Sequence, residues 1–206
     1  MSPKKSKAYH HGDLRTALIE AALGLIKNGG VEALTLRAAA RQAGVTHAAP
    51  YRHFEDKNAL LAAVAQSGFE QMAEDIVSAQ SKHDDTGEQM RATGVAYAEF
   101  AQHQPEHFAL MFGRVFADRD DYPKLQEASE ATFALLLNAI MRCQEDGILV
   151  DEDPKELALT AWSMTHGFAS LIAEGQLDAV GISGNQVSIM LRKIQDIMYQ
   201  GIGRKS

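Results

Sequence analysis

Residues 35–57, TLRAAARQAGVTHAAPYRHFEDK, constrain this 206-residue chain more than any other segment. The segment opens with a short amphipathic helix for which Thr35 can act as the N-cap. The apolar residues of this helix recur at i, i+3, i+4 and i+7, the spacing of one helical face: Leu36, Ala39, Ala40 and Ala43. Gly44 supplies the permissive backbone that a tight turn needs. The pattern therefore predicts a helix that ends in a sharp turn.

A second, shorter helix is expected after the turn, with Thr46 as its N-cap. Pro50 and Phe54 lie one turn apart and are expected to face inward. The remaining positions offer a polar and aromatic surface to a partner: His47, Ala48, Ala49, Tyr51, Arg52 and His53. A helix that only faced solvent would rarely hold a Tyr, an Arg and two His in so short a stretch. The segment therefore predicts a helix-turn-helix for duplex DNA.

Pro50 removes one backbone donor from this second helix. Two interpretations stay open at this point. The proline is tolerated because it lies near the first turn, or it bends the helix and alters how the helix docks in a DNA groove.

The net charge of the chain is −7, which is unfavourable for binding DNA, but the charge is unevenly distributed along the sequence. Residues 1–57 hold nine Lys and Arg against five Asp and Glu, a net charge of +4, and residues 58–206 hold eleven against twenty-two, a net charge of −11. A local positive face is enough to attract phosphate, and an acidic remainder orients the molecule by repelling the duplex. The basic part is the part that carries the helix-turn-helix.

The whole chain is predicted to be all-α, with about nine helices, because no run alternates β-branched and polar residues. An apolar stripe from Leu14 to Ile26 predicts the first helix, and Asp56 and Lys57 open the helix that follows the helix-turn-helix. Further helices are expected over 90–103, 105–112, 123–146, 154–174 and 186–200. We expect an N-terminal DNA-binding domain over 1–57 and a larger domain over 58–206.

Residues 9 to about 65 resemble the DNA-binding domain of the TetR family of bacterial transcriptional regulators. The resemblance rests on T-L-R-x-x-A-x-x-A-G-V-T followed by Y-R-H-F-x-x-K-x-x-L-L. The opening YHHGDLR and the W-x-x-x-H-G of Trp162, His166 and Gly167 are similar to a subgroup with a C-terminal domain of that motif. The resemblance implies a three-helix DNA-binding domain and a C-terminal domain that dimerises and senses a small molecule.

The resemblance also implies which side chains meet the operator. Base-edge contacts are expected for His47, Ala48, Ala49 and Arg52, and phosphate contacts for Thr46, Tyr51, His53 and Lys57. The chemistry agrees, because the Arg fork matches guanine and the Tyr hydroxyl and Lys ammonium suit phosphate oxygens. Arg37 and Arg41 are placed to hold the flanking backbone, and Thr35 completes the set.

The C-terminal half holds soft and aromatic residues that suit an effector pocket: Met111, Phe112, Phe116, Phe133, Met141, Trp162 and His166. The alternative is that they are ordinary core. An apolar or aromatic effector is expected, and a strongly anionic one is disfavoured unless Arg114 or Arg142 turns inward, because an unpaired charge is costly to bury. The last two helices are too apolar to stand exposed, so we expect a homodimer interface there with Phe168, Met190, Leu191, Ile194, Ile197 and Met198.

The sequence therefore predicts a repressor that binds a palindromic operator as a homodimer and leaves it when an effector binds. An activator or a ligand-independent DNA binder is the alternative. An enzyme is a remote third, because Ser163, His166 and Asp178 lack the G-x-S-x-G elbow of a hydrolase. No metal, cofactor or membrane segment is expected, because the His residues lack ligand spacing and no run of about eighteen apolar residues occurs. A single cysteine, Cys143, fits the bacterial cytoplasm, and we expect the protein at the nucleoid.

Overall fold

The computed structural model describes residues 11–113, 116 and 121–202. Every regular element in these residues is helical, which confirms the all-α prediction, and there are eight α-helices and three 3-10 helices within them. Contacts divide the chain into a first unit, residues 1–64, and a second unit, residues 65–206. The division lies inside a helix, beyond the predicted boundary at residue 57. Leu60, Leu61 and Val64 are buried and belong to the first unit, which explains the difference.

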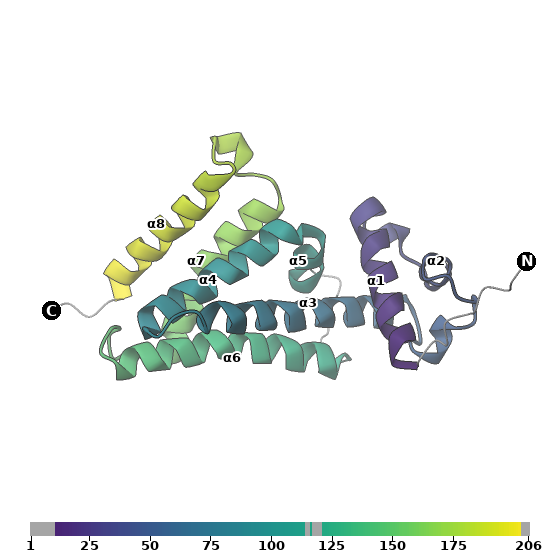
Figure 1. Ribbon diagram of the computed structural model, residues 1–206, viewed down its shortest axis with the longest axis horizontal. Coiled ribbons are helices and arrows are strands. Elements are labelled where there is room, and N and C mark those ends of the chain that lie inside the picture. The colour runs from purple at the N-terminus through teal and green to yellow at the C-terminus, as the bar shows by residue number, and fades with distance from the viewer. Residues whose placement is uncertain (1–10, 114–115, 117–120, 203–206) are drawn as a thin grey trace, which may run out of the picture. The chain divides into compact units, whose positions relative to one another are not determined.

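The first unit is built on α1 and α2 (Figure 1). Its elements are α1 (His11–Gly29), η1 (Val31–Ala33), α2 (Leu36–Gln42), η2 (Pro50–Arg52) and the first turns of α3 (Lys57–Gln80). The predicted apolar stripe of α1 is buried at Leu18, Ala22 and Ile26. Helix α1 ends at Gly29, and Gly30 takes a φ of 70° that suits a glycine after a helix.

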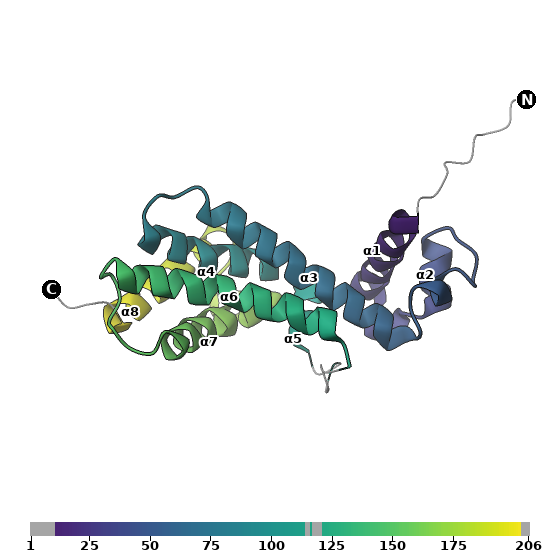
Figure 2. The same ribbon diagram turned by 90° about the horizontal axis from the view of Figure 1, so that it is seen from below.

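The second unit holds the remainder of α3 and five further α-helices (Figures 1 and 2). These are α4 (Thr86–His103), α5 (Pro105–Phe112), α6 (Pro123–Glu145), α7 (Pro154–Ala173) and α8 (Asn185–Ile202), with η3 (Asp178–Val180) before α8. Helix α4 contacts α5, α6, α7 and α8, so it is the central helix of this unit. Both views show α6 running beside α3.

The starts of these helices follow from local chemistry. Proline stands in the first turn of α5, α6 and α7, where its missing N–H leaves no hydrogen bond unmade. Asp153 accepts a hydrogen bond from the Lys155 backbone N–H at 2.8 Å and caps α7 as predicted. Helix α4 begins at Thr86, earlier than the predicted Met90, because Asp85 accepts from the Glu88 N–H at 2.8 Å and caps it there.

Candidate nucleic-acid interface and ligand cavity

Helix α2 and its turn form as the sequence predicts. The Thr35 hydroxyl accepts a hydrogen bond from the Ala38 N–H at 3.0 Å, so Thr35 is the N-cap. Leu36, Ala39 and Ala40 are buried on one face. Gly44 has a φ of 70°, a backbone conformation that other residues rarely adopt. The turn after α2 therefore depends on glycine.

The second element differs from the prediction. It is a short 3-10 helix, Pro50–Arg52, whose N-cap is Ala49 and not Thr46, and Ala49 makes no side-chain capping bond. In an α-helix the N–H of residue 50 would bond to the Thr46 carbonyl, but proline has no N–H. The Ala49 N–H bonds to that carbonyl instead, at 3.0 Å, and the Arg52 N–H bonds to the Ala49 carbonyl at 3.2 Å. These shorter-range bonds tighten the segment into a 3-10 turn. The change is larger than the tolerated proline or the bent helix that the sequence left open.

The inward and outward faces of this turn match the sequence pattern. Pro50 and Phe54 are buried, and the Arg15 guanidinium lies 5.7 Å from the centre of the Phe54 ring. The predicted DNA contacts that are exposed are Thr35, Arg37, Thr46, His47, Ala48, Tyr51 and Arg52, whereas Ala49, His53 and Lys57 are half-buried. Tyr51 is 56% exposed, a large value for an aromatic side chain. The turn thus presents Tyr51, Arg52 and His47 to any partner that approaches it.

Lys57 stands at the start of α3, as predicted. The Asp56 carboxylate accepts from the Ala59 N–H at 2.8 Å and so occupies one of the free amides of this helix end. An anion at this end would meet the Lys57 ammonium and the remaining amides, with Asp56 beside them.

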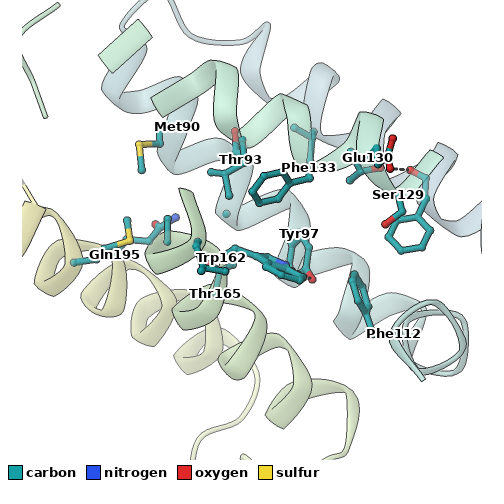
Figure 3. Close-up of a pocket in the computed structure, with 18 of the residues that line it drawn as sticks. Met90, Thr93, Tyr97, Phe112, Ser129, Glu130, Phe133, Trp162, Thr165 and Gln195 are labelled. Atoms are coloured by element: carbon teal, nitrogen blue, oxygen red, sulfur yellow. Dashed lines mark hydrogen bonds between the residues drawn. The ribbon is translucent and has the colours of Figure 1, made fainter. Parts of the chain in front are cut away.

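The second unit contains a cavity of about 390 Å³ (Figure 3). Six helices, α3 to α8, contribute to its wall, which is mainly apolar and aromatic. The lining residues are Phe69, Ile76, Met90, Thr93, Gly94, Tyr97, Phe112, Ser129, Glu130, Thr132, Phe133, Leu136, Leu159, Ala161, Trp162, Thr165, Gln195, Met198 and Tyr199. Its size and lining are those of a small-molecule site.

A hydrogen-bonded group of three side chains lies at the wall. The Trp162 Nε1–H donates to the Tyr97 hydroxyl at 3.2 Å, and that hydroxyl lies 2.7 Å from His166 Nδ1. Trp162 can only donate, so Tyr97 can donate its own proton to a neutral His166, which leaves each hydrogen with an acceptor. Burial raises the pKa of Tyr97 and lowers that of His166. Phe108 and Phe112 also flank His166, with ring centres 5.5 and 4.7 Å away.

The structure brings three of the predicted pocket residues to the cavity wall: Phe112, Phe133 and Trp162. His166 is one step removed, because it contacts the cavity through Tyr97. The other three lie elsewhere and correct the sequence-based set: Met111 is fully buried in packed core, Phe116 is buried against Tyr122 with ring centres 5.7 Å apart, and Met141 is 42% exposed. Arg142 is exposed and does not line the cavity, and Arg114 lies outside the described residues.

Sequence reasoning missed the polar and α4 residues of the wall, including Thr93, Tyr97 and Gln195. Gln195 is the least expected of these, because a glutamine on an amphipathic helix is normally assigned to the solvent face. The only available signal was its position on α8, one residue from Ile194 and three from Met198.

The residues predicted for the dimer interface differ in how exposed they are in the structure. Phe168, Leu191 and Met198 are buried in the cores of their own chain, so these three positions correct the predicted interface. Met190 and Ile194 are half-buried, and Ile197 is 64% exposed. The other large apolar side chains exposed on α7 and α8 are Leu159, Leu171 and Ile189.

The described residues contain no group of three or more His, Cys, Asp or Glu side chains placed to hold a metal ion. Within the same residues, no helix combines the length and apolar character needed to cross a membrane.

Comparison with known proteins identifies both units. Residues 18–64 match the family described as bacterial regulatory proteins, tetR family, and residues 90–190 match the tetracyclin repressor-like C-terminal domain. An HTH-type transcriptional regulator of Mycobacterium tuberculosis is 27% identical over 180 residues, which is 86% of this chain and 78% of the relative.

Two solved structures give the same result for the fold. A Rhodococcus sp. RHA1 protein of unknown function is 32% identical, with a TM-score of 0.83 over 97% of this chain and 100% of the other. The Bacillus subtilis transcriptional regulator FadR, solved with stearoyl-CoA, is 14% identical, with a TM-score of 0.74 over 91% of this chain and 98% of the other.

Proposed function

The chain belongs to the TetR family of bacterial regulatory proteins, and on that premise we propose that it is a ligand-released repressor. A homodimer binds an inverted-repeat operator and leaves it when a small molecule enters the cavity of the second unit. The observation that carries the proposal is the pairing, in one chain, of an exposed Tyr51 and Arg52 on a helix-turn-helix with an apolar cavity of about 390 Å³. Its site of action is chromosomal DNA in the bacterial cytoplasm.

The mechanism requires two states of the dimer. In one state the two helix-turn-helix segments fit successive major grooves, and in the other their separation is wrong for the operator. A ligand shifts this balance only by its difference in affinity for the two states. The coupling is reciprocal, so the operator lowers ligand affinity by the factor by which the ligand lowers operator affinity, with a typical coupling of about 1–3 kcal/mol.

The DNA contacts can be tested by comparing Arg52→Ala with Lys57→Ala. Arg52 offers a planar fork that recognises guanine, so its loss should remove discrimination at one base position per half-site, at about 1–3 kcal/mol. Lys57 is a point charge at a helix end, so its loss should weaken all sequences alike and reduce the salt slope by about 1. Titration of a randomised operator set at several salt concentrations measures both effects.

Lys82→Ala serves as the matched control, since it removes one exposed positive charge from the second unit. It should leave base discrimination and the salt slope unchanged. If Arg52→Ala weakened every sequence equally, the base-reading role would be wrong. If no inverted-repeat site were bound at all, the proposed function would fail.

We assign the dimer interface to the exposed apolar residues of α7 and α8, above all Ile197. Ile197→Asp should raise the dimer dissociation constant by at least about tenfold, because a charge would be buried against the second copy. Val77→Asp is the control, since Val77 is also an exposed apolar residue, 50% exposed, on α3. Sedimentation equilibrium measures both, and an intact dimer with Ile197→Asp would move the interface elsewhere.

The effector role is tested by operator binding with and without a compound bound in the cavity. Release of the operator supports a repressor that leaves the DNA when its ligand binds. Tighter operator binding would instead indicate a co-repressor or an activator. An unchanged operator affinity across all compounds that bind would favour the ligand-independent DNA binder.

A further inference from the structure

The charge of the cavity wall limits what the cavity can hold. Among the described lining residues there is no Lys or Arg, and the one carboxylate, Glu130, is exposed and accepts a hydrogen bond from Gln126 at 2.8 Å. An anionic group buried there would have no cation beside it, which is costly. Phe69, Phe133 and Trp162 supply apolar surface instead. The wall therefore favours an uncharged and largely apolar molecule.

Most polar groups of the wall already have partners within the protein. The Thr93 hydroxyl donates to the Gln89 carbonyl at 3.0 Å and accepts from Gln80 Nε2 at 2.8 Å. The Thr132 hydroxyl donates to the backbone of Ala128 at 2.8 Å. The Tyr199 hydroxyl donates to the Gly87 carbonyl at 3.2 Å. These groups therefore need no ligand to complete their hydrogen bonds.

Gln195 differs from these groups. Its side chain lines the cavity from α8 (Figure 3), and the residue is only 4% exposed. Its Oε1 is the one buried side-chain nitrogen or oxygen of the described residues that has no hydrogen-bond partner. Leaving such an acceptor unpaired is unfavourable. A native protein rarely keeps one without a use.

The orientation of this carboxamide is fixed by its surroundings. Gln195 Nε2 donates to the Arg91 backbone carbonyl at 2.8 Å, and a carbonyl can only accept, so the nitrogen and not the oxygen must face Arg91. The Arg91 side chain is itself held to α8, because it bonds to Asp196 at 2.6 Å and lies 4.2 Å over the Tyr199 ring. The free acceptor is thus held in one position before any ligand arrives.

Gly94 makes room for the carboxamide. A Cβ atom at residue 94 would lie 2.6 Å from Gln195 Nε2, closer than atoms can pack, so any larger residue would displace the amide. Gly94 also lines the cavity. The amide therefore reaches this part of the wall only because residue 94 has no side chain.

We propose that the cavity takes an uncharged, largely apolar molecule with an O–H or N–H group that donates a hydrogen bond to Gln195 Oε1. The inference rests on the proposed function only in treating the cavity as the effector site. It adds the chemical class of the ligand and the residue that selects it.

The test compares pairs of compounds in which O-methylation removes the donor and keeps the oxygen: decanol with methyl decyl ether, and para-butylphenol with para-butylanisole. Decanoate serves as the anionic counterpart of decanol. Dissociation constants are measured on the full chain by calorimetry and by the fluorescence of Trp162, the only tryptophan. Each hydroxyl compound should bind at least about tenfold more tightly than its ether, the factor that corresponds to one hydrogen bond. Decanoate should bind more weakly than decanol.

Gln195→Met removes the acceptor and keeps the length of the side chain, so the preference for the hydroxyl compound should fall to about one in this variant. Gln144→Met is the matched control, because Gln144 Nε2 also donates to backbone carbonyls, at 2.9 and 2.8 Å, but does not line the cavity. It should keep the tenfold preference. Gly94→Ala, which displaces the same amide, should reduce the preference even if Gln195→Met does not fold.

Four results would overturn the inference: ethers that bind as tightly as alcohols, decanoate that binds more tightly than decanol, a preference unchanged in Gln195→Met, or no binding by either hydroxyl compound. The first would mean that the ligand makes no hydrogen bond to Oε1. Operator binding is measured on the same protein samples. Intact operator binding without alcohol preference refutes the ligand class alone, whereas alcohol preference without operator binding refutes the proposed function alone.

Discussion

Replacing Tyr97 by phenylalanine removes one oxygen atom and two hydrogen bonds. The Trp162 Nε1–H loses its acceptor at 3.2 Å, and His166 Nδ1 loses its partner at 2.7 Å. The shape of the ring and its edge contact with Phe108, at 5.7 Å, are kept. The variant therefore isolates the polar contribution of the hydroxyl to the stability of the second unit.

The magnitude follows from the burial of the two partners. One unsatisfied buried polar group costs about 1–3 kcal/mol. Trp162 and His166 are half-buried, so water satisfies part of what each of them loses. We therefore expect the free energy of unfolding to fall by about 2 kcal/mol in total, below the sum of two full penalties. For a chain of this length that corresponds to a decrease in Tm of roughly 4–8 °C.

Urea unfolding followed by Trp162 fluorescence measures this loss, because the only tryptophan lies in the second unit. An unchanged m value would show that the compactness of the folded and unfolded states is preserved. Tyr199→Phe is the matched control, since its hydroxyl donates a single bond to the Gly87 carbonyl and leaves no donor unpaired. A loss no larger than that of Tyr199→Phe would refute the reasoning. Additive effects of Tyr97→Phe and His166→Phe would refute it as well.

Three further outcomes are expected. Burial lowers the pKa of His166 below its ordinary value of 6.5, so the unfolded chain binds the proton more readily than the folded chain does. The free energy of unfolding therefore falls as the pH drops below that value. The variant His166→Gln should lose less stability than the unmodified protein between about pH 7 and pH 5, measured by urea unfolding at each pH. Gly44→Ala should destabilise the first unit by about 1–2 kcal/mol in calorimetry, because the φ of 70° is unfavourable for alanine while the added Cβ meets nothing within 4 Å; an equally stable variant would contradict this. Gly167→Ala should raise the free energy of unfolding by about 0.5–1 kcal/mol, because alanine favours a helix over glycine and the added Cβ meets no atom of the chain within 4 Å. A loss of stability would contradict the open space at this position.

The helices could be predicted from the sequence where local chemistry decides them. The apolar spacing of α1, the Thr35 cap and the prolines that begin α5, α6 and α7 each act within a few residues, so no knowledge of the tertiary structure is needed. Pro50 was the local exception. The sequence shows that Pro50 lacks an N–H. It does not show that the loss of this one donor shortens the whole segment to a 3-10 turn.

The cavity could be predicted only in part, because its wall depends on which side of each helix faces inward. Trp162 and Phe133 were predicted from their size and chemistry, and both line it. Met111 is also large and apolar but is fully buried in packed side chains. Gln195 lies at the helical spacing of the buried Leu191 and Met198, so periodicity alone places it inward. Its residue type argues for the solvent face, and the burial is explained only by the contact with Arg91 on α4, more than one hundred residues earlier in the chain.

Cys143 is the only cysteine of the chain, and its side chain is fully buried, with Sγ donating to the Thr86 carbonyl at 3.3 Å. Burial raises the pKa of its thiol, so the reactive thiolate is scarce in the folded protein. Maleimide dyes or spin labels attached at an introduced surface cysteine, such as Lys82→Cys, therefore need no cysteine-free background. In the unmodified protein the rate at which Cys143 is alkylated therefore reports how often the contact between α4 and α6 opens. A compound that fills the neighbouring cavity would lower this alkylation rate.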